Sequence, residues 1–249
     1  MFPKIENWDL FKAKVDYICE HIIKAISNDR SDCHIFSVDE KTGLQALQRS
    51  TMTRLSPGKT TRIEYEYKRK GTTCLMAGIN VGTGLVKHNR IHPTRKEEDF
   101  IIFMKALVGD IPKTDKIIIM LDQLNIHKSA SLAQWVAKQI GYKGDLGKKK
   151  KRGILQNQQT RMEFLQNPTH RIQFIYTPKH CSWLNPIENW FGKLQKQRIT
   201  KASFSSIHEL SQDIEKYIMY YNTHWAKPCN WKFKGFVKNY QLNENILSG

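Results

Sequence analysis

The chain has 249 residues, of which 40% are hydrophobic and 25% are charged, so it can bury a sizeable core and is neither disordered nor collagen-like. Its 40 lysine and arginine residues exceed its 23 acidic residues and give a net charge of +17 at pH 7, which favours a polyanionic partner such as nucleic acid. The longest unbroken apolar runs contain five residues, far short of the roughly 20 that span a bilayer, and the first residues lack the pattern of a signal peptide. These features argue against a membrane or secreted protein, and we expect a cytoplasmic location.

The first part of the chain predicts one helix and at least one strand. Apolar residues recur every three or four positions over 6–28, which predicts an amphipathic helix. Residues 33–39 predict a strand, and Gly43 is expected in the turn that follows it. Residues 61–68 alternate imperfectly and predict a strand or an extended arm.

The middle of the chain predicts a hairpin, a helix and a buried strand. Residues 73–80 and 84–92 flank the turn signal Gly82-Thr83-Gly84, which is the pattern of a β-hairpin. Residues 97–108 carry one apolar face and predict a helix. Within residues 116–122, the five positions 117–121 are all apolar. This pattern is typical of a strand that helices cover on both faces.

A lysine-rich segment follows the next helix. Ser129 is expected to cap a helix that reaches Ile140. Residues 143–170 pass from a glycine-containing turn through five basic residues into a stretch rich in Gln and Asn. We interpret this segment as an insertion or long surface loop with one short helix near 158–165, and residues 171–176 as a strand.

The C-terminal part predicts two helices and a tail. The helices are expected over 186–198 and 207–222, and a capping box from Ser206 to Glu209 opens the second. The tail 227–238 interleaves aromatic residues with lysines. Packing of these aromatic residues onto the domain is the first interpretation, and stacking on nucleic-acid bases is the alternative.

No internal repeat, coiled coil or linker divides the chain. Leading strands, followed by strands that alternate with helices, predict one α/β domain with a mixed central sheet flanked by helices. We assign residues 1–30 to an N-terminal amphipathic helix and residues 31–249 to this domain, with the lysine-rich insertion at about 143–170.

Three acidic residues stand at the ends of predicted elements. Asp39 ends the first strand, and Asp122 ends the buried strand, at the sheet edge where α/β folds bind ligands. Glu188 lies in the first turn of a helix. Three converging carboxylates would suit two divalent cations such as Mg²⁺, about 3.5–4 Å apart, which activate an attacking oxygen and stabilise a leaving one.

Each acid also has a simpler interpretation. Asp39 suits a solvated turn, where the neighbouring Glu40 competes for any role, and Asp122 suits a cap on the following turn. Glu188 suits the third position of a helix that Asn185 opens as N-cap. Zinc and nucleotide chemistry lack support, because the sequence contains no C-x-x-C, no H-E-x-x-H and no phosphate-binding G-x-x-x-x-G-K-[ST] motif.

Four segments around the acids decide between these interpretations. They read VDEKTGLQAL at 38–47, LDQLNIH at 121–127, PKHCSWLNPIE at 178–188 and YNTHWAKP at 221–228. In this order they resemble the catalytic core of DDE transposases, specifically the bacterial insertion-sequence enzymes of the mariner-like superfamily. The resemblance covers residues from about 33 to 236.

The resemblance implies a ribonuclease-H-like fold in which Asp39, Asp122 and Glu188 are the catalytic, metal-binding triad. It implies two Mg²⁺ ions, for which Mn²⁺ can substitute, and attack of an activated water on a DNA phosphodiester. The freed 3′-hydroxyl would then attack target DNA. The resemblance also implies double-stranded DNA as partner, insertion at TA dinucleotides and two protomers assembled on paired element ends.

Two features depart from typical relatives. Glu188 follows Asp122 by 66 positions, a longer spacing that the segment 143–170 would account for as a surface insertion. Relatives also carry N-terminal helix-turn-helix modules, and about thirty residues before the first strand hold only one helix. We therefore expect either an upstream helix-turn-helix half, encoded separately and joined by frameshifting, or a truncated gene.

Ten further residues are candidates for DNA contact. Some follow the second acid, some form the basic run, and some precede the helix of the third acid: Asn125, His127, Lys148, Lys149, Lys150, Lys151, Arg152, Lys179, His180 and Trp183. The basic run would add sequence-independent, salt-sensitive affinity, although it also suits a solvated loop. Trp183 also suits a core position.

The sequence thus predicts a metal-dependent transposase catalytic domain that cleaves DNA and transfers strands. Two other functions stay open: a non-catalytic DNA-binding remnant, which would bind DNA without cutting it, and a ribonuclease-H-like nuclease, which would cut DNA without joining it to a target.

Overall fold

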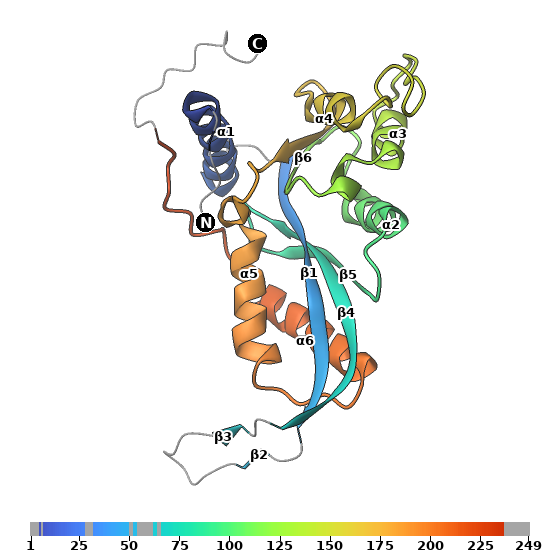
Figure 1. Ribbon diagram of the computed structural model, residues 1–249. Helices are drawn as coiled ribbons and strands as arrows, with labels where there is room; N and C mark the ends of the chain where they lie inside the picture. The colour runs from blue at the N-terminus through green and yellow to red at the C-terminus, as the bar shows by residue number, and fades with distance from the viewer. Residues whose placement is uncertain are drawn as a thin grey trace.

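Figure 1 shows the computed structural model, which describes residues 5, 7–27, 32–49, 52–53, 62–63 and 66–236. A five-stranded sheet forms its centre in the order β5-β4-β1-β6-β7. β4 is antiparallel to β1 and β5, whereas β6 is parallel to β1 and β7. The strand bounds are β1 Cys33–Arg49, β4 Tyr67–Asn80, β5 Val86–His92, β6 Lys116–Leu121 and β7 Ile172–Tyr176. This order is that of a ribonuclease-H-like sheet, and the predicted fold class is confirmed.

Helices cover both faces of the sheet (Figure 1). One face carries α2 Glu97–Val108, α3 Ala130–Gln139 and α4 Gln158–Gln166. The other face carries α1 Trp8–Ser27, α5 Ile187–Leu194 and α6 Ile207–His224. Neighbouring residues of one strand point to opposite faces, so Val38 lies in the core with α2 and α3 while Ile35 packs beside α1. Among the described residues, no helix combines the length and apolar character that crossing a bilayer requires.

Most predicted elements are confirmed within a few residues, including the hairpin of β4 and β5, the buried strand β6 and the capped helices. The Ser129 side chain accepts from the Leu132 backbone N–H at the start of α3, and Ser206 accepts from the Glu209 backbone N–H at the start of α6. The second bond of the expected capping box is shifted by one residue, because the Glu209 carboxylate accepts from the backbone N–H of Ser205 instead of Ser206. The helix expected over 186–198 is α5 followed by a π-helical turn, 195–199.

The turn expected at Gly43 is wrong, because β1 continues through it to Arg49. Gly43 has a φ of +67° and sits where the pairing of β1 with β4 shifts register, between Lys41 and Leu44. A glycine that signals a turn also suits a β-bulge, where one strand carries an extra residue and bends. Of the arm expected over 61–68, the short strand β3 Arg62–Ile63 pairs with β2 Met52–Thr53, and residues 61, 64 and 65 lie outside the described residues.

The lysine-rich segment 143–170 divides into an exposed part and a packed part. Residues 148–153 are exposed. From Leu155 onward the segment enters the core, where α4 buries Phe164 and Leu165. Arg161 of α4 is buried and donates to the backbone carbonyls of Lys128 and Leu155 at 2.7 and 2.9 Å. The short helix is therefore confirmed, but it is part of the core rather than a surface loop.

The C-terminal tail packs on α1. Trp231 and Phe233 are partly buried against the cluster that contains α1, and the backbone N–H of Phe236 donates to Asp16 Oδ1 at 2.7 Å. This agrees with the packing interpretation for the tail up to residue 236. Residues 237 and 238 lie outside the described residues.

Candidate active site

The pairing of β1 with β6 brings Asp39 and Asp122 together. The two strands are parallel, and Ser37 lies opposite Met120 in their register. Two residues after this pair come Asp39, which lies within β1, and Asp122, which directly follows β6, so the two acids lie at neighbouring positions on the same face of the sheet. The expectation that Asp39 ends the first strand is wrong, because β1 continues to Arg49 and Asp39 still pairs with Ala77 of β4. α5, which carries Glu188, packs on that face.

Asp39 is a partly buried carboxyl with other acids nearby. Its Oδ1 accepts from the backbone N–H of Glu40 at 2.7 Å, and its Oδ2 accepts from Asn185 Nδ2 at 3.1 Å. Burial raises the pKa of Asp39 to about 7, and the charges of Glu40, Asp122 and Glu188 add to the rise. Asp122 and Glu188 are therefore close enough for their charges to act on Asp39.

Asp122 is held by a histidine. Its Oδ1 accepts from the Leu124 backbone N–H at 2.9 Å and lies 2.8 Å from Nδ1 of His127. Burial tends to raise the pKa of Asp122, but the hydrogen bond and positive charge of His127 outweigh it and lower the pKa. Asp122 is thus maintained as a carboxylate.

His127 connects Asp122 with Glu40. Its ring is fully buried, and Nε2 lies 2.8 Å from Glu40 Oε1, whose side chain is also buried. Burial opposes protonation, yet Glu40 and Asp122 together raise the pKa of His127 to about 10. Because both ring nitrogens are engaged inside the protein, the expectation that His127 contacts DNA is wrong, and the residue supports Asp122 instead.

Glu188 lies on the exposed side of the first turn of α5. The cap expected at Asn185 is absent, because its side chain makes no bond to the helix. Instead the Asn185 amide is buried against β1, where it donates to the Val38 carbonyl and to Asp39. A local pattern that resembles a helix cap is therefore used for a contact between distant parts of the chain.

The donor set suits a hard divalent cation. Asp39 and Asp122 offer neighbouring carboxylates, with Glu188 within electrostatic range, and Mg²⁺ or Mn²⁺ would favour the ionised form of Asp39, whose pKa is raised by burial and by the nearby acids. Within the described part of the chain, no three acidic, histidine or cysteine side chains are already arranged around one ion position. Asp39 and Asp122 are instead occupied by donors of the protein itself.

The other DNA-contact candidates lie on the surface. Lys179 and His180 are exposed in the loop before α5, and His180 has a φ of +60°, an uncommon conformation for a residue with a side chain. Trp183 is about half exposed at 49%, with its ring 5.6 Å from that of Phe233. Asn125 is exposed and accepts a hydrogen bond from Gln158.

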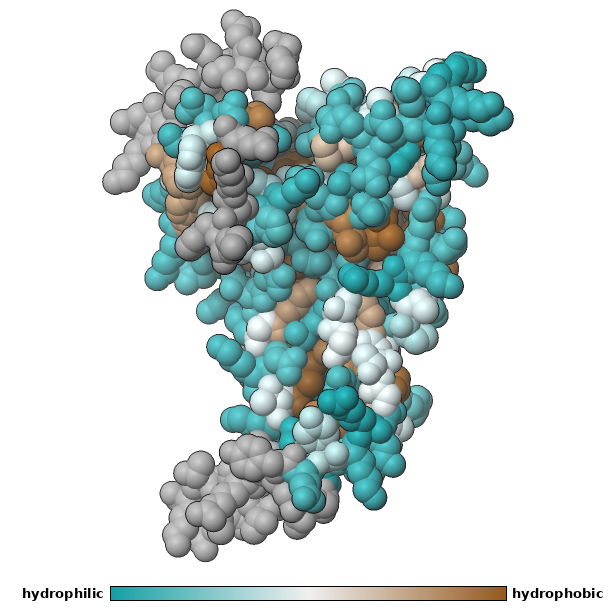
Figure 2. Space-filling view, in the orientation of Figure 1, coloured by the Kyte–Doolittle hydropathy of each residue, from teal (hydrophilic) through white to brown (hydrophobic). Residues whose placement is uncertain are grey.

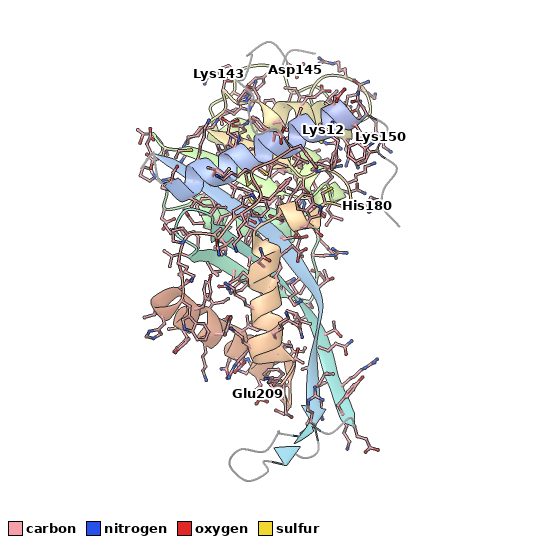
Figure 3. The ribbon with its side chains drawn as sticks, turned by 90° about the vertical axis from the view of Figure 1, so that its left-hand side faces the viewer. Lys12, Lys143, Asp145, Lys150, His180 and Glu209 are labelled. Atoms are coloured by element: carbon pink, nitrogen blue, oxygen red, sulfur yellow. The ribbon has the colours of Figure 1, made fainter. Side chains whose placement is uncertain are left out.

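The basic run Lys148–Arg152 occupies a loop at one end of the molecule. Figure 3 shows Lys143, Asp145 and Lys150 at that end, with His180 between it and α5. Figure 2 shows that the surface over α3, α4 and their connecting loop is almost entirely hydrophilic. Arg152 pairs with Asp145 at 2.5 Å, and the five basic side chains are exposed.

Two charged residues near Asp122 were not among the predicted site residues. Glu40 was considered only as a rival of Asp39. Lys128 is nearly buried at 8% exposure, and burial and Lys179 lower the pKa of Lys128 while Asp122 acts in the opposite direction. The signal for Lys128 was its position directly after His127, one turn beyond the second acid.

Comparison with known proteins identifies the family and supports the fold. A family model described as DDE superfamily endonuclease matches residues 34–211, and no curated protein matches the sequence. The Mos1 strand transfer complex has a TM-score of 0.52 at 11% identity, covering 88% of this chain and 58% of that chain. The Mos1 mariner paired end complex with Mn has a TM-score of 0.50 at 11% identity, covering 88% and 59%.

A third structure, the Mos1 transposase paired-end complex with left transposon end, has a TM-score of 0.50 at 12% identity over 88% of this chain and 57% of that chain. The chain thus spans less than three fifths of these three Mos1 chains, and at these identities the likeness shows a shared fold. The family model, in contrast, covers most of the chain, including all three predicted acids. The chain belongs to the DDE superfamily endonucleases.

Proposed function

We propose that this chain is the catalytic domain of a mariner-like insertion-sequence transposase of bacterial origin, which cleaves DNA and transfers the freed 3′ end to target DNA. One observation carries the proposal: Asp39 of β1 and Asp122, directly after the parallel strand β6, lie at neighbouring positions on the face where α5 presents Glu188, and the charges of Asp122 and Glu188 both act on Asp39. Family membership supports the same reaction class.

In this proposal Asp39, Asp122 and Glu188 hold two Mg²⁺ or Mn²⁺ ions, which supply Lewis acidity at the scissile phosphate. His127 keeps Asp122 ionised and oriented, and Asn185 orients Asp39. The exposed Lys179 and the other basic side chains attract the DNA backbone.

The partners follow from the same reasoning. The name of one similar structure describes Mos1 transposase paired with a transposon end. For this chain we propose double-stranded DNA as substrate and a homodimer on DNA.

Nicking of supercoiled plasmid in Mg²⁺ or Mn²⁺ tests the proposal. The variants Asp39→Asn, Asp122→Asn and Glu188→Gln are expected to lose nicking by at least about 100-fold while they retain DNA binding in a gel shift. Glu98→Gln is the matched control for Glu188, because Glu98 is also an exposed glutamate in the first turn of a helix, α2. It should nick like the parent chain.

Two results would redirect the proposal. A full chain that shifts DNA but never nicks it with either metal would be a non-catalytic DNA-binding protein. A chain that nicks plasmid but never joins a 3′-hydroxyl oligonucleotide to it would be a nuclease without strand transfer.

A further inference from the structure

Two polar side chains, Ser37 and Asn185, are buried between β1 and the start of α5. Ser37 is 0% exposed and Asn185 is 1% exposed, although 148 positions separate them in the chain. Burying polar groups costs free energy unless they are hydrogen-bonded. Their position therefore requires a complete set of partners.

The two residues satisfy each other and the backbone around them. The Ser37 hydroxyl donates to Asn185 Oδ1 and accepts from the Ile187 backbone N–H at 2.8 Å. Asn185 Nδ2 donates to the Val38 carbonyl at 3.0 Å and to Asp39 Oδ2 at 3.1 Å. Every side-chain donor of the pair is thus used, and the first amide of α5 is bound directly to the sheet.

These bonds join two of the proposed metal ligands. Asp39 comes two residues after Ser37 on the same face of β1, and Glu188 directly follows Ile187. The pair therefore sets both the orientation of the Asp39 carboxyl and the position of the first turn of α5. Groups that hold metal ligands in place typically change metal affinity or activity by about 10–100-fold when they are removed.

We propose that Ser37 and Asn185 are positioning residues that fix Glu188 relative to Asp39. This inference rests on the proposed function, because it concerns the spacing of the same carboxylates. It is carried by the hydrogen bonds that join the buried Ser37 and Asn185 to each other, to β1 and to the first amide of α5.

The chain offers a matched control for a purely structural role. Asn222 of α6 also joins a helix to a strand, since its side chain accepts from the Val86 backbone N–H and donates to the Val86 carbonyl, both at 2.9 Å. No acidic side chain takes part in this contact among the described residues. Asn222→Ala thus removes a similar connection away from the proposed ligands.

Three measurements on the full chain test the inference: plasmid nicking, Mn²⁺ affinity by electron paramagnetic resonance, and hydrogen exchange of the peptide that contains Ile187. Ser37→Ala and Asn185→Ala should weaken Mn²⁺ binding and slow nicking by about 10–100-fold. Exchange at the start of α5 should accelerate in both variants, while α2 and α3 exchange as in the parent. Asn222→Ala should bind Mn²⁺ and nick as the parent does.

The outcomes separate the two proposals. A parent chain that neither binds Mn²⁺ nor nicks DNA overturns the proposed function. If the parent does both and Ser37→Ala and Asn185→Ala match it, or if Asn222→Ala is impaired as much, the positioning role alone is overturned. Ser37→Ala removes a single oxygen, so it keeps the test decisive should Asn185→Ala fail to fold.

Discussion

Asp39 of β1 and Asp122, directly after β6, lie side by side on one face of the sheet, yet their surroundings act on them in opposite directions. Asp39 is held by a backbone N–H and the neutral amide of Asn185, and its pKa is raised to about 7. Asp122 is held by the positively charged His127, and its pKa is lowered. One of two neighbouring acids is therefore ready to bind a cation at any physiological pH, whereas the other gives up its proton with difficulty.

The difference shows where the site needs external charge. The positive charge of His127 lies between Asp122 and Glu40 and interacts with both. Of the two acids, Glu40 has the buried side chain. Within the part of the chain that the structure describes, Asp39 has no such counter-charge and faces three other acids. A divalent cation between the two acids is expected to favour the ionised form of Asp39, because it supplies an opposite charge against the burial and the neighbouring acids that raise the pKa of Asp39.

The largest effect is expected from His127→Ala, which removes the positive charge that holds Asp122. His127→Ala should reduce the free energy of unfolding by about 3–5 kcal/mol, because Glu40 would remain buried at 3% side-chain exposure without its partner. Urea denaturation at pH 7 measures this change. His34→Ala is the control: His34 pairs with Asp115 at 2.9 Å, but at side-chain exposures of 27% and 15%, and should cost about 1 kcal/mol or less. Equal effects would show that the buried imidazole does not hold the two acids.

Much of this arrangement could be predicted from the sequence. The apolar run that ends at Asp122 identifies a buried strand with an acid at its carboxyl end, and the segment around Glu188 identifies a helix start. These features depend on local periodicity and on turn signals, which a single segment contains. The sheet order then follows from the topology that the resemblance implies.

The supporting contacts could not be predicted, because they join distant segments. Asn185 reaches Ser37 across 148 positions, and His127 reaches Glu40 across 87. Locally, Asn185 suits a helix cap and His127 suits an exposed loop, and tertiary contacts override both patterns. Gly43 shows the same limit, since the local signal for a turn does not distinguish it from a bulge within a long strand.

The second prediction concerns Asp39→Asn, a variant that removes the uncompensated charge of Asp39. The pKa of Asp39 is about 7 in the folded chain and near 3.9 in an unfolded one, so the folded chain binds more protons between these pH values. Stability contributed by this group should therefore fall as pH rises from about 4 to about 7 and stay low above that. Asp39→Asn should abolish this slope and stabilise the chain at pH 8 by as much as about 4 kcal/mol.

Urea denaturation between pH 4 and pH 9 measures both curves. Asp122→Asn is the contrasting variant, because the lowered pKa of Asp122 means that its charge stabilises the fold and its removal should destabilise it at pH 8. His127 contributes a separate decrease in the free energy of unfolding at higher pH, because its pKa is about 10 in the folded chain and near 6.5 in an unfolded one. The stabilisation from His127 is therefore complete below about pH 6.5 and disappears as the pH rises through about 10. An Asp39→Asn variant less stable than the parent at pH 8 would contradict the comparison.

The third prediction concerns added Mn²⁺, which would supply a positive charge beside Asp39 while the acid itself stays in place. Mn²⁺ at about 100 times its dissociation constant should stabilise the parent by about 2.7 kcal/mol at pH 8, and removal of the ion with EDTA should reverse the gain. Asp39→Asn should lose most of this response, whereas Glu98→Gln should keep it. Thermal unfolding with and without Mn²⁺ measures the shift. A full response in Asp39→Asn would place the ion elsewhere.

The smallest effect is expected from a variant of the basic loop 148–152, which should change DNA affinity without changing the nicking reaction at the acids. The side chains of Lys149, Lys150 and Lys151 are exposed, whereas Arg152 at the end of the run pairs with Asp145, so the variant replaces only the three lysines with Gln and leaves that ion pair intact. A plot of the log of DNA affinity against the log of salt concentration should become shallower by about one unit for each phosphate that the chain no longer neutralises. Nicking at saturating DNA should be unchanged, because the loop contributes no charge at Asp39 or Asp122.

A variant with Gln at Lys12, Lys14 and Lys24 of α1 removes the same number of charges and serves as the control. Equal salt slopes in the two triple variants would attribute DNA binding to the net charge of +17 rather than to the loop. A slower reaction at saturating DNA in the loop variant would mean that the basic run also acts at the carboxylates, and binding and chemistry would then no longer be separable in this chain. Unchanged chemistry with a shallower salt slope would instead assign the loop to gathering DNA and the two aspartates to acting on it.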